Sequence, residues 1–476
     1  MKRTREKYEI TGDFIDECQT EFNADVSNRI ARNAIVTVGS MLGATNVNRL
    51  KEISHIFLNT VKRQNLKATD QGHTGRCWMF AALNAFRHIL VKVLNLSNFE
   101  FSETYLFFWD KLERSNTYLQ WFIDNPEKTT QELPFNWMTN SCMEDGGWWS
   151  SFANLIEKYG IVPKDVMNES FQSSESDTMN RIIKDILNST ANLIMKKRKR
   201  VGKSELIKIK NRTVKQIYNI LVKYFGEPPR KFEWRFTDSD GESNVITDLT
   251  PILFAELVIP ELCMTNFVSL ACLPVKPLVS KRKYSIKHTS NIVGGRDCEF
   301  LNVNIEELEK YAAKSISLGI AVWFAADVMK HFNYAHSALD DELDDSDLIF
   351  GNEPKRMTKG ERMLFKSTQG THAMCLVGFN SNEKGQVTSW QVENSWGYWD
   401  NETPGADGFL WMSKSWFRRF VSEIVIHKKL LSRTMSKLAE QEPEQLEPWN
   451  SVAPGILRVG CVDAPKGYRD AIKLRR

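Results

Sequence analysis

The chain has 476 residues, of which 42% are hydrophobic and 26% charged, and its formal net charge is +4. This length exceeds what a single hydrophobic core usually organises, so we expect one main domain with large additions. The near balance of charge excludes a uniformly basic or acidic protein, and local runs of charge are more informative than the total. No run of about 18 uninterrupted apolar residues occurs, which excludes a membrane-spanning helix and predicts no membrane partner.

Cysteine usage indicates a reducing compartment. The cysteines are scattered, with no Cys-x-x-Cys pair and no zinc-ligand spacing with histidine, at Cys18, Cys77, Cys142, Cys263, Cys272, Cys298, Cys375 and Cys461. We therefore expect free thiols, no metal and no cofactor. Residues 1–8 are charged and lack the apolar segment of a secretory signal, so the expected location is the cytoplasm.

Helices are predicted for the first part of the chain. Residues 1–65 have the pattern of a helical N-terminal arm. The apolar periodicity from Cys77 to Leu94 predicts a helix within residues 66–160. The spacing of Ile, Leu and Lys from Met179 to Tyr224 predicts further helices within residues 161–290.

Strands are predicted for residues 291–430. β-branched and aromatic residues gather there in three runs, Ala321–Phe324, Ala373–Phe379 and Ser389–Glu393. These runs are expected to form one sheet, and residues 431–476 follow it as a C-terminal arm. Helices in the first part and strands in the second indicate an α+β fold.

The strongest local charges lie in two opposite clusters. Lys196–Arg200 consists of five basic residues, and more basic residues follow up to Lys215 with Glu205 as the only acid. Such a run is typical of a solvated helix face or loop, and also of a patch that binds nucleic acid weakly and without sequence preference. Both interpretations stay open. The acidic cluster Asp340–Asp347 lacks the glycine of a calcium loop and is expected to be a solvated turn.

Three separated segments predict one chemistry. Gln71 lies six residues before Cys77, which begins an apolar helical run, and His372 and Asn394 follow far downstream in that order. A cysteine at a helix N-terminus is favoured as the thiolate, and an imidazole partner adds to this. Asn394 can orient the imidazole, while the Gln71 amide and the Cys77 N–H can bind an oxygen that gains negative charge. The residues therefore predict a Cys/His/Asn hydrolase site.

The structural alternative for Cys77 is an inert buried thiol. That alternative does not explain why Gln-x5-Cys-Trp, an apolar-flanked His372 and the Asn-Ser-Trp-Gly segment 394–397 occur in one chain. Trp396 fits two compatible roles. It is either a core aromatic residue or a cover over the bond between Asn394 and His372.

These segments resemble the bleomycin hydrolase type of papain-like cysteine peptidases, which includes bacterial aminopeptidase C. Further blocks match in the family's order between about Phe14 and Trp449, namely Asp145–Trp148, Glu157–Lys164, Asn291–Arg296 and Ala321–Phe324. The resemblance implies a papain-like fold with a helical left half, residues 66–160, and a β-rich right half, residues 291–430. The inserted region 161–290 would then serve oligomerisation.

The resemblance also implies roles and partners. Cys77 would be the nucleophile, His372 the acid and base, Asn394 its orienting partner and Gln71 the oxyanion donor. In papain-like folds a Gly-Gly pair such as Gly146–Gly147 lets substrate backbone approach closely; a tight turn is the alternative. The implied protein is a broad-specificity cytosolic aminopeptidase acting on peptides, and also on homocysteine thiolactone and the carboxamide of bleomycin, as a homohexamer. The alternative from another class is a catalytically idle, basic-channelled oligomer that binds nucleic acid.

Three features depart from the papain pattern or the family pattern. His372 lies 295 positions after Cys77, against roughly 130–150 in papain and cathepsins. Thr74 stands where those enzymes carry a cysteine, so a disulfide typical of secreted relatives lacks one partner. Family members end shortly after a tryptophan that matches Trp449, with a carboxylate that receives the substrate's amino group. Here 20 residues follow Ile456, so we expect trimming, displacement or weakened selectivity.

Overall fold

The computed structural model describes residues 9–39, 43–61, 66–259, 262–345, 349–350, 357–398 and 407–449. The C-terminal extension after Ile456, the carboxylate position expected near it and Cys461 lie outside these residues. The chain divides into two compact units. The smaller comprises residues 1–54 and 340–356, and the larger comprises residues 55–339 and 357–476.

The smaller unit contains the helical arm expected from the sequence, with α2 (Gly12–Ala24), α3 (Val26–Val38) and the short α5 (Val47–Leu50). Neither α2 nor α3 contains a buried residue. The solvated turn expected at the acidic cluster is wrong for Asp340, which is 1% exposed. Arg49 supplies the reason, because its Nε lies 2.7 Å from the Asp340 carboxylate.

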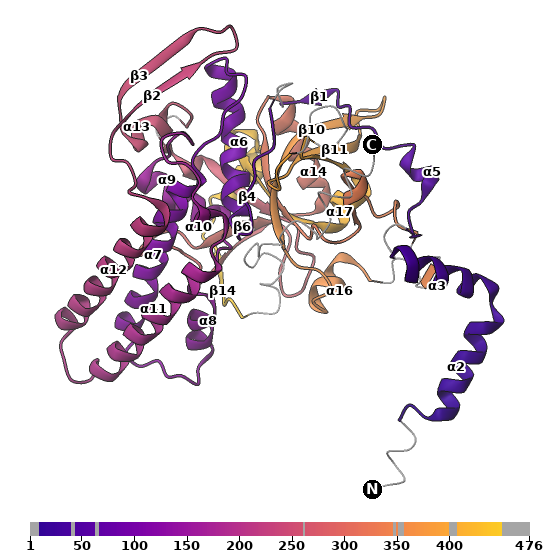
Figure 1. The fold of residues 1–476 in the computed structure, drawn as a ribbon, viewed down its shortest axis with the longest axis horizontal. Helices are drawn as coiled ribbons and strands as arrows, with labels where there is room; N and C mark the ends of the chain where they lie inside the picture. Colours follow the sequence, from indigo (N-terminus) through magenta and orange to yellow (C-terminus); the bar gives the residue numbers. More distant parts are fainter. Residues whose placement is uncertain are drawn as a thin grey trace. The chain divides into compact units, whose positions relative to one another are not determined.

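A large mixed sheet forms the centre of the larger unit (Figure 1). Its strands run in the order β14-β5-β6-β4-β13-β7-β10-β11-β12-β9-β8, and β1 pairs with β10. Their bounds are β14 Glu444–Leu446, β5 Arg282–Ile286, β6 Cys298–Asn302, β4 Phe267–Ala271, β13 Val421–His427, β7 Val322–Ala326, β10 His372–Ser381, β11 Val387–Glu393, β12 Phe409–Ser413, β9 Ala338–Leu339, β8 Phe332–Asn333 and β1 Asn59–Thr60. The three predicted strand runs are confirmed as β7, β10 and β11.

The helix predicted from Cys77 is confirmed as α6 (Cys77–Val93). It packs against β10 and β7, and nearly all of its side chains are buried because the sheet covers one side and other helices the rest. The indole Nε1 of Trp323 on β7 donates a hydrogen bond to the Trp78 carbonyl at 3.0 Å. This bond fixes the first turn of α6 on the sheet.

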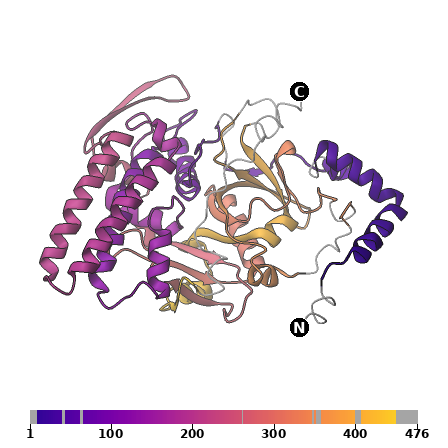
Figure 2. The same ribbon diagram turned by 60° about the horizontal axis from the view of Figure 1, so that its bottom comes forward.

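Other helices of the larger unit surround this core. Figures 1 and 2 show α7, α11 and α12 grouped beside one another, away from the sheet. The helical bounds are α7 Glu103–Asp124, α8 Leu133–Ser141, α9 Trp149–Tyr159, α10 Phe171–Ser174, α11 Asp177–Lys197, α12 Lys203–Phe225, α13 Pro251–Glu256, α14 Ile305–Ser317, α16 Lys359–Leu364, α17 Lys414–Phe420 and α18 Arg433–Ala439. In the described parts of the chain, no helix is both long and apolar enough to cross a membrane.

Residues 161–290 contain the helices predicted there, but they also contain a hairpin and two strands of the central sheet, β4 and β5, which were not predicted. In α11 the buried residues Met179, Ile183 and Leu187 repeat every four positions, which produces one apolar face. Lys196 and Lys197 end this helix and are exposed, as both interpretations of the basic run expect. The hairpin of β2 (Phe232–Thr237) and β3 (Ser243–Leu249) follows α12 and was not predicted.

Candidate active site

Cys77 occupies the first position of α6 and is fully buried. The preceding Arg76 makes no side-chain cap, so no side chain of the N-cap residue competes for the helix's first N–H groups. Unpaired N–H groups and the positive end of the helix dipole favour negative charge at this position. The helix start is therefore suited to a thiolate.

The segment before Cys77 is attached to the segment that carries Asn394. The Gln71 backbone N–H donates to the Ser395 carbonyl at 2.9 Å, and the Ser395 hydroxyl donates to Gln71 Oε1 at 2.6 Å. Asp70 and Trp396 form an isolated antiparallel bridge beside this pair. The segment that carries Gln71, the candidate oxyanion donor, is thus hydrogen-bonded to the segment that carries Asn394, the candidate orienting residue.

The Gln71 side chain is fully buried, and its amide orientation is set by its partners. Its Oε1 accepts from Ser395, so the opposite end of the amide, Nε2, carries the N–H groups. Nε2 donates to the Thr74 carbonyl at 2.8 Å. The side chain is held across the turn that leads to Cys77.

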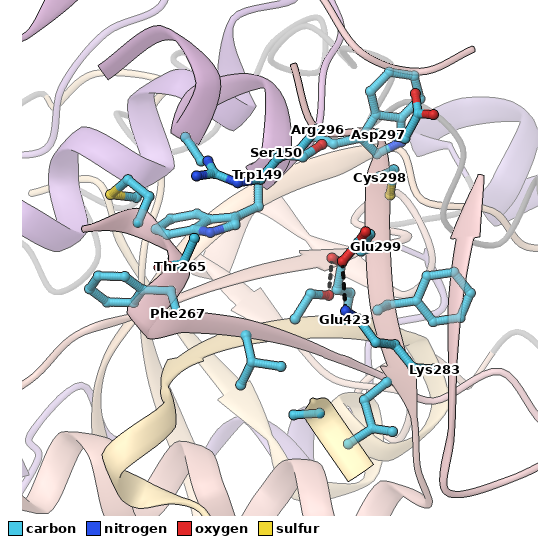
Figure 3. A pocket seen from close by; sticks show the side chains of 18 of the residues that line it. Trp149, Ser150, Thr265, Phe267, Lys283, Arg296, Asp297, Cys298, Glu299 and Glu423 are labelled. Atoms are coloured by element: carbon cyan, nitrogen blue, oxygen red, sulfur yellow. Dashed lines mark hydrogen bonds and ion pairs between the residues drawn. The ribbon is translucent and has the colours of Figure 1, made fainter. Parts of the chain in front are cut away.

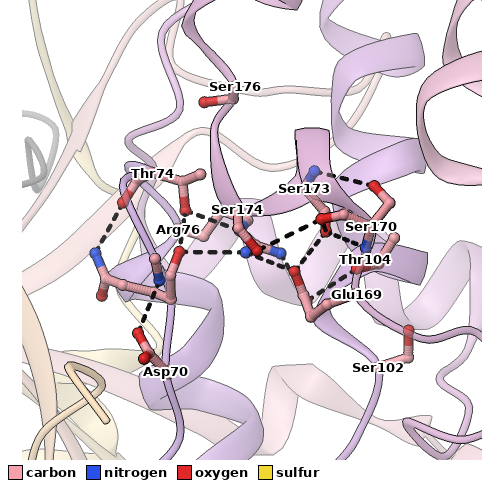
Figure 4. Close-up of polar contacts among 12 residues, drawn as sticks. Asp70, Thr74, Arg76, Ser102, Thr104, Glu169, Ser170, Ser173, Ser174 and Ser176 are labelled. Atoms are coloured by element: carbon pink, nitrogen blue, oxygen red, sulfur yellow. Dashed lines mark hydrogen bonds and ion pairs between the residues drawn. The ribbon is translucent and has the colours of Figure 1, made fainter.

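Arg76 holds the same turn from the other side (Figure 4). Its guanidinium Nε donates to the Thr74 hydroxyl at 2.9 Å, and its two terminal nitrogens bind the two Glu169 carboxylate oxygens at 3.0 and 2.9 Å. Burial acts to raise the pKa of Glu169, but Arg76 and the Ser173 and Thr104 hydroxyls hold that pKa below its usual value. The residue before Cys77 is therefore fixed by a bidentate ion pair whose arginine is fully buried and whose glutamate is partly buried.

His372 and Asn394 are brought together as the sequence predicted. His372 begins β10 and Asn394 follows β11, the neighbouring strand. His372 Nε2 lies 2.8 Å from Asn394 Oδ1. Since a carboxamide oxygen only accepts, Nε2 carries the proton of this hydrogen bond. His372 Nδ1 is buried and has no partner among the described residues.

Trp396 covers this histidine. Its ring lies 4.7 Å from the His372 ring, with 26° between the planes, and it is 2% exposed. This position of Trp396 fits both roles that the sequence suggested for it. The indole is part of the core and also shields the bond between His372 and Asn394 from water.

Cys77 and the histidine strand share one apolar core. Ala373, the residue after His372, belongs to the same buried cluster as Cys77 and Trp78. Ala325 on β7 pairs with Ala373 and is also in this cluster. The packing of α6 on β10 thus places the helix that begins at Cys77 against the strand that begins at His372.

A buried ionic cluster links α6 to β11 directly beside Asn394. Glu393 is fully buried, and its two carboxylate oxygens contact the Arg87 guanidinium and His88 Nε2, the latter at 2.7 Å. Burial acts against ionisation, yet Arg87 and His88 hold the pKa of Glu393 below its usual value. His88 is therefore a packed residue that is hydrogen-bonded to Glu393.

Gly146 and Gly147 are buried, and Gly147 lies against Trp78 of α6. The Gly146 carbonyl accepts a hydrogen bond from Arg114 at 2.8 Å. A Cβ at position 147 would lie 2.5 Å from Trp78 Cε2, so only glycine fits against this indole. The close approach seen here is to Trp78 of the same chain.

Sequence reasoning missed the charged residues that support the site. Arg76 precedes Cys77 directly and Glu393 precedes Asn394 directly, and both are buried. A charged residue adjoining each candidate residue within an apolar segment is the signal that could have found them. Their partners Glu169 and Arg87 carry no such local signal.

Comparison with known proteins agrees with this geometry. Residues 9–453 match the model of the Peptidase C1-like family. Aminopeptidase C of Listeria monocytogenes is 32% identical over 93% of this chain and 98% of that protein. Human bleomycin hydrolase is 34% identical over 84% of this chain and 89% of that protein. The crystal structure of PepW from Lactobacillus rhamnosis HN001 superposes with a TM-score of 0.88 at 30% identity, covering 94% and 99% of the two chains.

The α+β architecture and these similarities define a papain-like cysteine peptidase. The chain belongs to the Peptidase C1-like family. Its relatives make it a cysteine-type aminopeptidase.

Proposed function

We propose that this cysteine aminopeptidase removes N-terminal residues from peptides through an acyl-enzyme formed on Cys77. The observation that carries the proposal is the hydrogen bond from His372 Nε2 to Asn394 Oδ1, which leaves the buried Nδ1 without another partner in the described chain. A ring held in this way has one nitrogen committed to orientation and the other available for proton exchange with a thiol.

The proposed reaction begins with proton transfer from the Cys77 thiol to His372 Nδ1. The thiolate attacks the carbonyl carbon of the first residue, a C–S bond forms, and the carbonyl oxygen becomes an oxyanion. The Cys77 N–H and the Gln71 side-chain amide stabilise this oxyanion. When the C–N bond breaks, His372 Nδ1–H protonates the leaving amine.

Deacylation reverses these roles. Water enters the position left by the amine, and His372 Nδ1 takes one of its protons while the oxygen attacks the thioester carbon. The C–S bond then breaks, the free amino acid leaves, and the proton returns to the Cys77 sulfur. Asn394 keeps the ring in one orientation through both steps.

We propose a broad range of acyl substrates. Any acyl group that reaches the thiolate can be transferred to water, so homocysteine thiolactone and the carboxamide of bleomycin fit the same chemistry. The resemblance to bleomycin hydrolase supports this range. Gly146 and Gly147 are proposed to border the bound substrate backbone, since Gly147 lies against Trp78, the neighbour of Cys77.

The setting and assembly are proposed on separate grounds. Free cysteines among the described residues agree with a reducing cytoplasm, and the resemblance supports a homohexamer. The basic run Lys196–Arg200 spans the end of α11 and the residues after it, and four of its five residues are exposed, which is compatible with weak, sequence-independent nucleic-acid binding. Replacing these five residues by Gln is expected to abolish any such binding, measured by salt-dependent fluorescence anisotropy. Binding that survives this change or high salt would contradict the electrostatic explanation.

The aminopeptidase proposal is tested with methionyl-aminomethylcoumarin and its N-acetyl derivative. Wild-type protein is expected to release coumarin from the free-amine substrate, with the Cys77→Ser protein as the control for background hydrolysis. The acetylated substrate is expected to be at least tenfold poorer in kcat/KM. Equal rates on both substrates would contradict aminopeptidase selectivity while leaving a cysteine peptidase in place.

A further inference from the structure

A cavity of about 220 Å³ lies between the N-terminus of α9 and the sheet (Figure 3). Residues of β4, β6 and β13 line it, together with Trp149 of α9. Figure 3 shows the Trp149 and Phe267 rings on one side of the Glu423 carboxyl group. The cavity therefore combines aromatic walls with one deeply buried acid.

Glu423 is the unusual member of this lining. It lies on β13 and is 2% exposed. Its Oε1 accepts a hydrogen bond from the Ser269 hydroxyl, whereas Oε2 has no partner among the described residues. Burial raises the pKa of this carboxyl to about 7, with only the Ser269 hydrogen bond acting against the shift. No counter-ion within the described chain offsets that burial.

Besides Glu423, the lining holds five charged residues; four of them are already paired, and the fifth is Lys428. Lys283 Nζ lies 2.9 Å from the Glu299 carboxylate. Arg296 lies 2.7 Å from Glu157, and the Asp297 carboxylate accepts the backbone N–H groups of residues 289 and 290 at 2.9 and 2.8 Å. Glu423 is therefore the acid of this lining whose Oε2 contacts no hydrogen-bond donor or cation among the described residues.

We propose that this cavity is a binding site for a small organic cation, an ammonium or guanidinium group on an apolar stem, with Glu423 as its counter-ion. The cationic group would donate to Glu423 Oε2. The stem would lie against Trp149 and Phe267, where apolar contact and cation–π attraction add to the ion pair. An anion of the same size is disfavoured by the buried carboxylate.

The proposal is tested by calorimetric titration of the full-length protein with 2-phenylethylamine and with 2-phenylethanol, which has the same shape without the charge. Wild-type protein is expected to bind the amine at least about tenfold more tightly than the alcohol, because a hydrogen-bonded charge pair is worth roughly 1.5–3 kcal/mol. Glu423→Gln is expected to remove this preference. Equal binding of both compounds by wild-type protein, or an unchanged preference in Glu423→Gln, would overturn the proposal.

Glu299→Gln is the matched control, since it makes the same chemical change in the same cavity at an acid already paired with Lys283. It is expected to change amine affinity less than threefold. A loss as large as that of Glu423→Gln would overturn the assignment of Glu423 as the counter-ion. Independently of any variant, wild-type crystals soaked with 2-(4-bromophenyl)ethylamine should show bromine in the cavity and the ammonium group beside Glu423. Bromine located only elsewhere would also reject the site.

Discussion

Two buried glutamates of one sheet have opposite pKa shifts, because one contacts cationic side chains and the other does not. Glu393 ends β11 beside Asn394, and Arg87 and His88 of α6 contact its carboxylate. Glu423 on β13 receives a hydrogen bond from Ser269 and no cation within the described residues. The pKa of Glu393 is lowered despite burial, whereas that of Glu423 rises to about 7.

The comparison shows that burial alone does not set the direction in which the pKa of a carboxyl group shifts. Desolvation penalises the charged form of both carboxyls, and only a partner of opposite charge reverses its effect. At β11 the partners come from α6, the helix that begins at Cys77, so these contacts also join α6 to the strand that precedes Asn394. At β13 no such partner is supplied, and a cavity adjoins the acid instead. We therefore assign chemistry and positioning to the first region and ligand binding to the second.

The largest expected effect is a loss of activity on substitution of Cys77, in the region of α6 and β11. Cys77→Ser is expected to lower kcat/KM on an aminoacyl-coumarin by at least about 10⁴-fold, because the thiolate is the attacking group. The substitution keeps the helix start and should leave the thermal transition unchanged. Steady-state kinetics and circular dichroism measure the two quantities. Substantial residual activity in a folded Cys77→Ser protein would place the chemistry elsewhere.

The second prediction concerns stability. Glu393→Gln leaves the Arg87 charge buried without its counter-ion, and breaking a buried pair in this way costs about 3–5 kcal/mol. Urea unfolding at pH 8 is expected to show this loss. The same change at Glu423 is expected to leave stability equal or higher, because it removes an unpaired buried charge. Equal losses from the two substitutions would break the comparison.

The third prediction uses the sign of the pKa shifts. The pKa of Glu423 rises from 4.5 to about 7 on folding, so the native state holds its proton more tightly. Its favourable contribution is complete below about pH 4.5 and is lost as pH rises to about 7, a change of roughly 3 kcal/mol. The difference in unfolding free energy between wild type and Glu423→Gln should follow this curve.

Glu393 should give the opposite trend. Because its pKa is lowered, its stabilising contribution is present above the unfolded value and is lost as pH falls. A wild-type minus Glu393→Gln difference that grew on acidification would contradict the pairing with Arg87 and His88.

The smallest expected effect lies within the first region. Asn394→Ala removes the acceptor that orients His372 but leaves Trp396 stacked on the ring, so kcat should fall about 10- to 100-fold. The pH-rate profile should shift as well, because the imidazolium loses a hydrogen-bond acceptor. If neither kcat nor the profile changed, orientation by Asn394 would be rejected.

Local patterns predicted much of the fold around the site. The apolar run after Cys77 predicted α6, and the β-rich runs predicted β7, β10 and β11, because helix and strand periodicities are properties of short segments. The hydrogen bond between His372 and Asn394 was also anticipated, from the order of these residues and from the family resemblance.

Contacts between remote side chains could not be predicted in this way. Arg87 and Glu393 are 306 positions apart, and nothing in either segment specifies the other. The same applies to Asp340, which was expected in a solvated turn and is buried against Arg49. Pairings of this kind follow from tertiary packing, which no window of sequence contains.

Labelling with a thiol-directed epoxide tests the central claim most directly. The protein is incubated with the reagent, residual activity is followed, and the modified peptide is identified by mass spectrometry. We predict one label per chain, on Cys77, with activity lost in proportion to labelling and no label on the Cys77→Ser protein. Full labelling of another cysteine, or complete labelling of Cys77 with activity retained, would contradict the account.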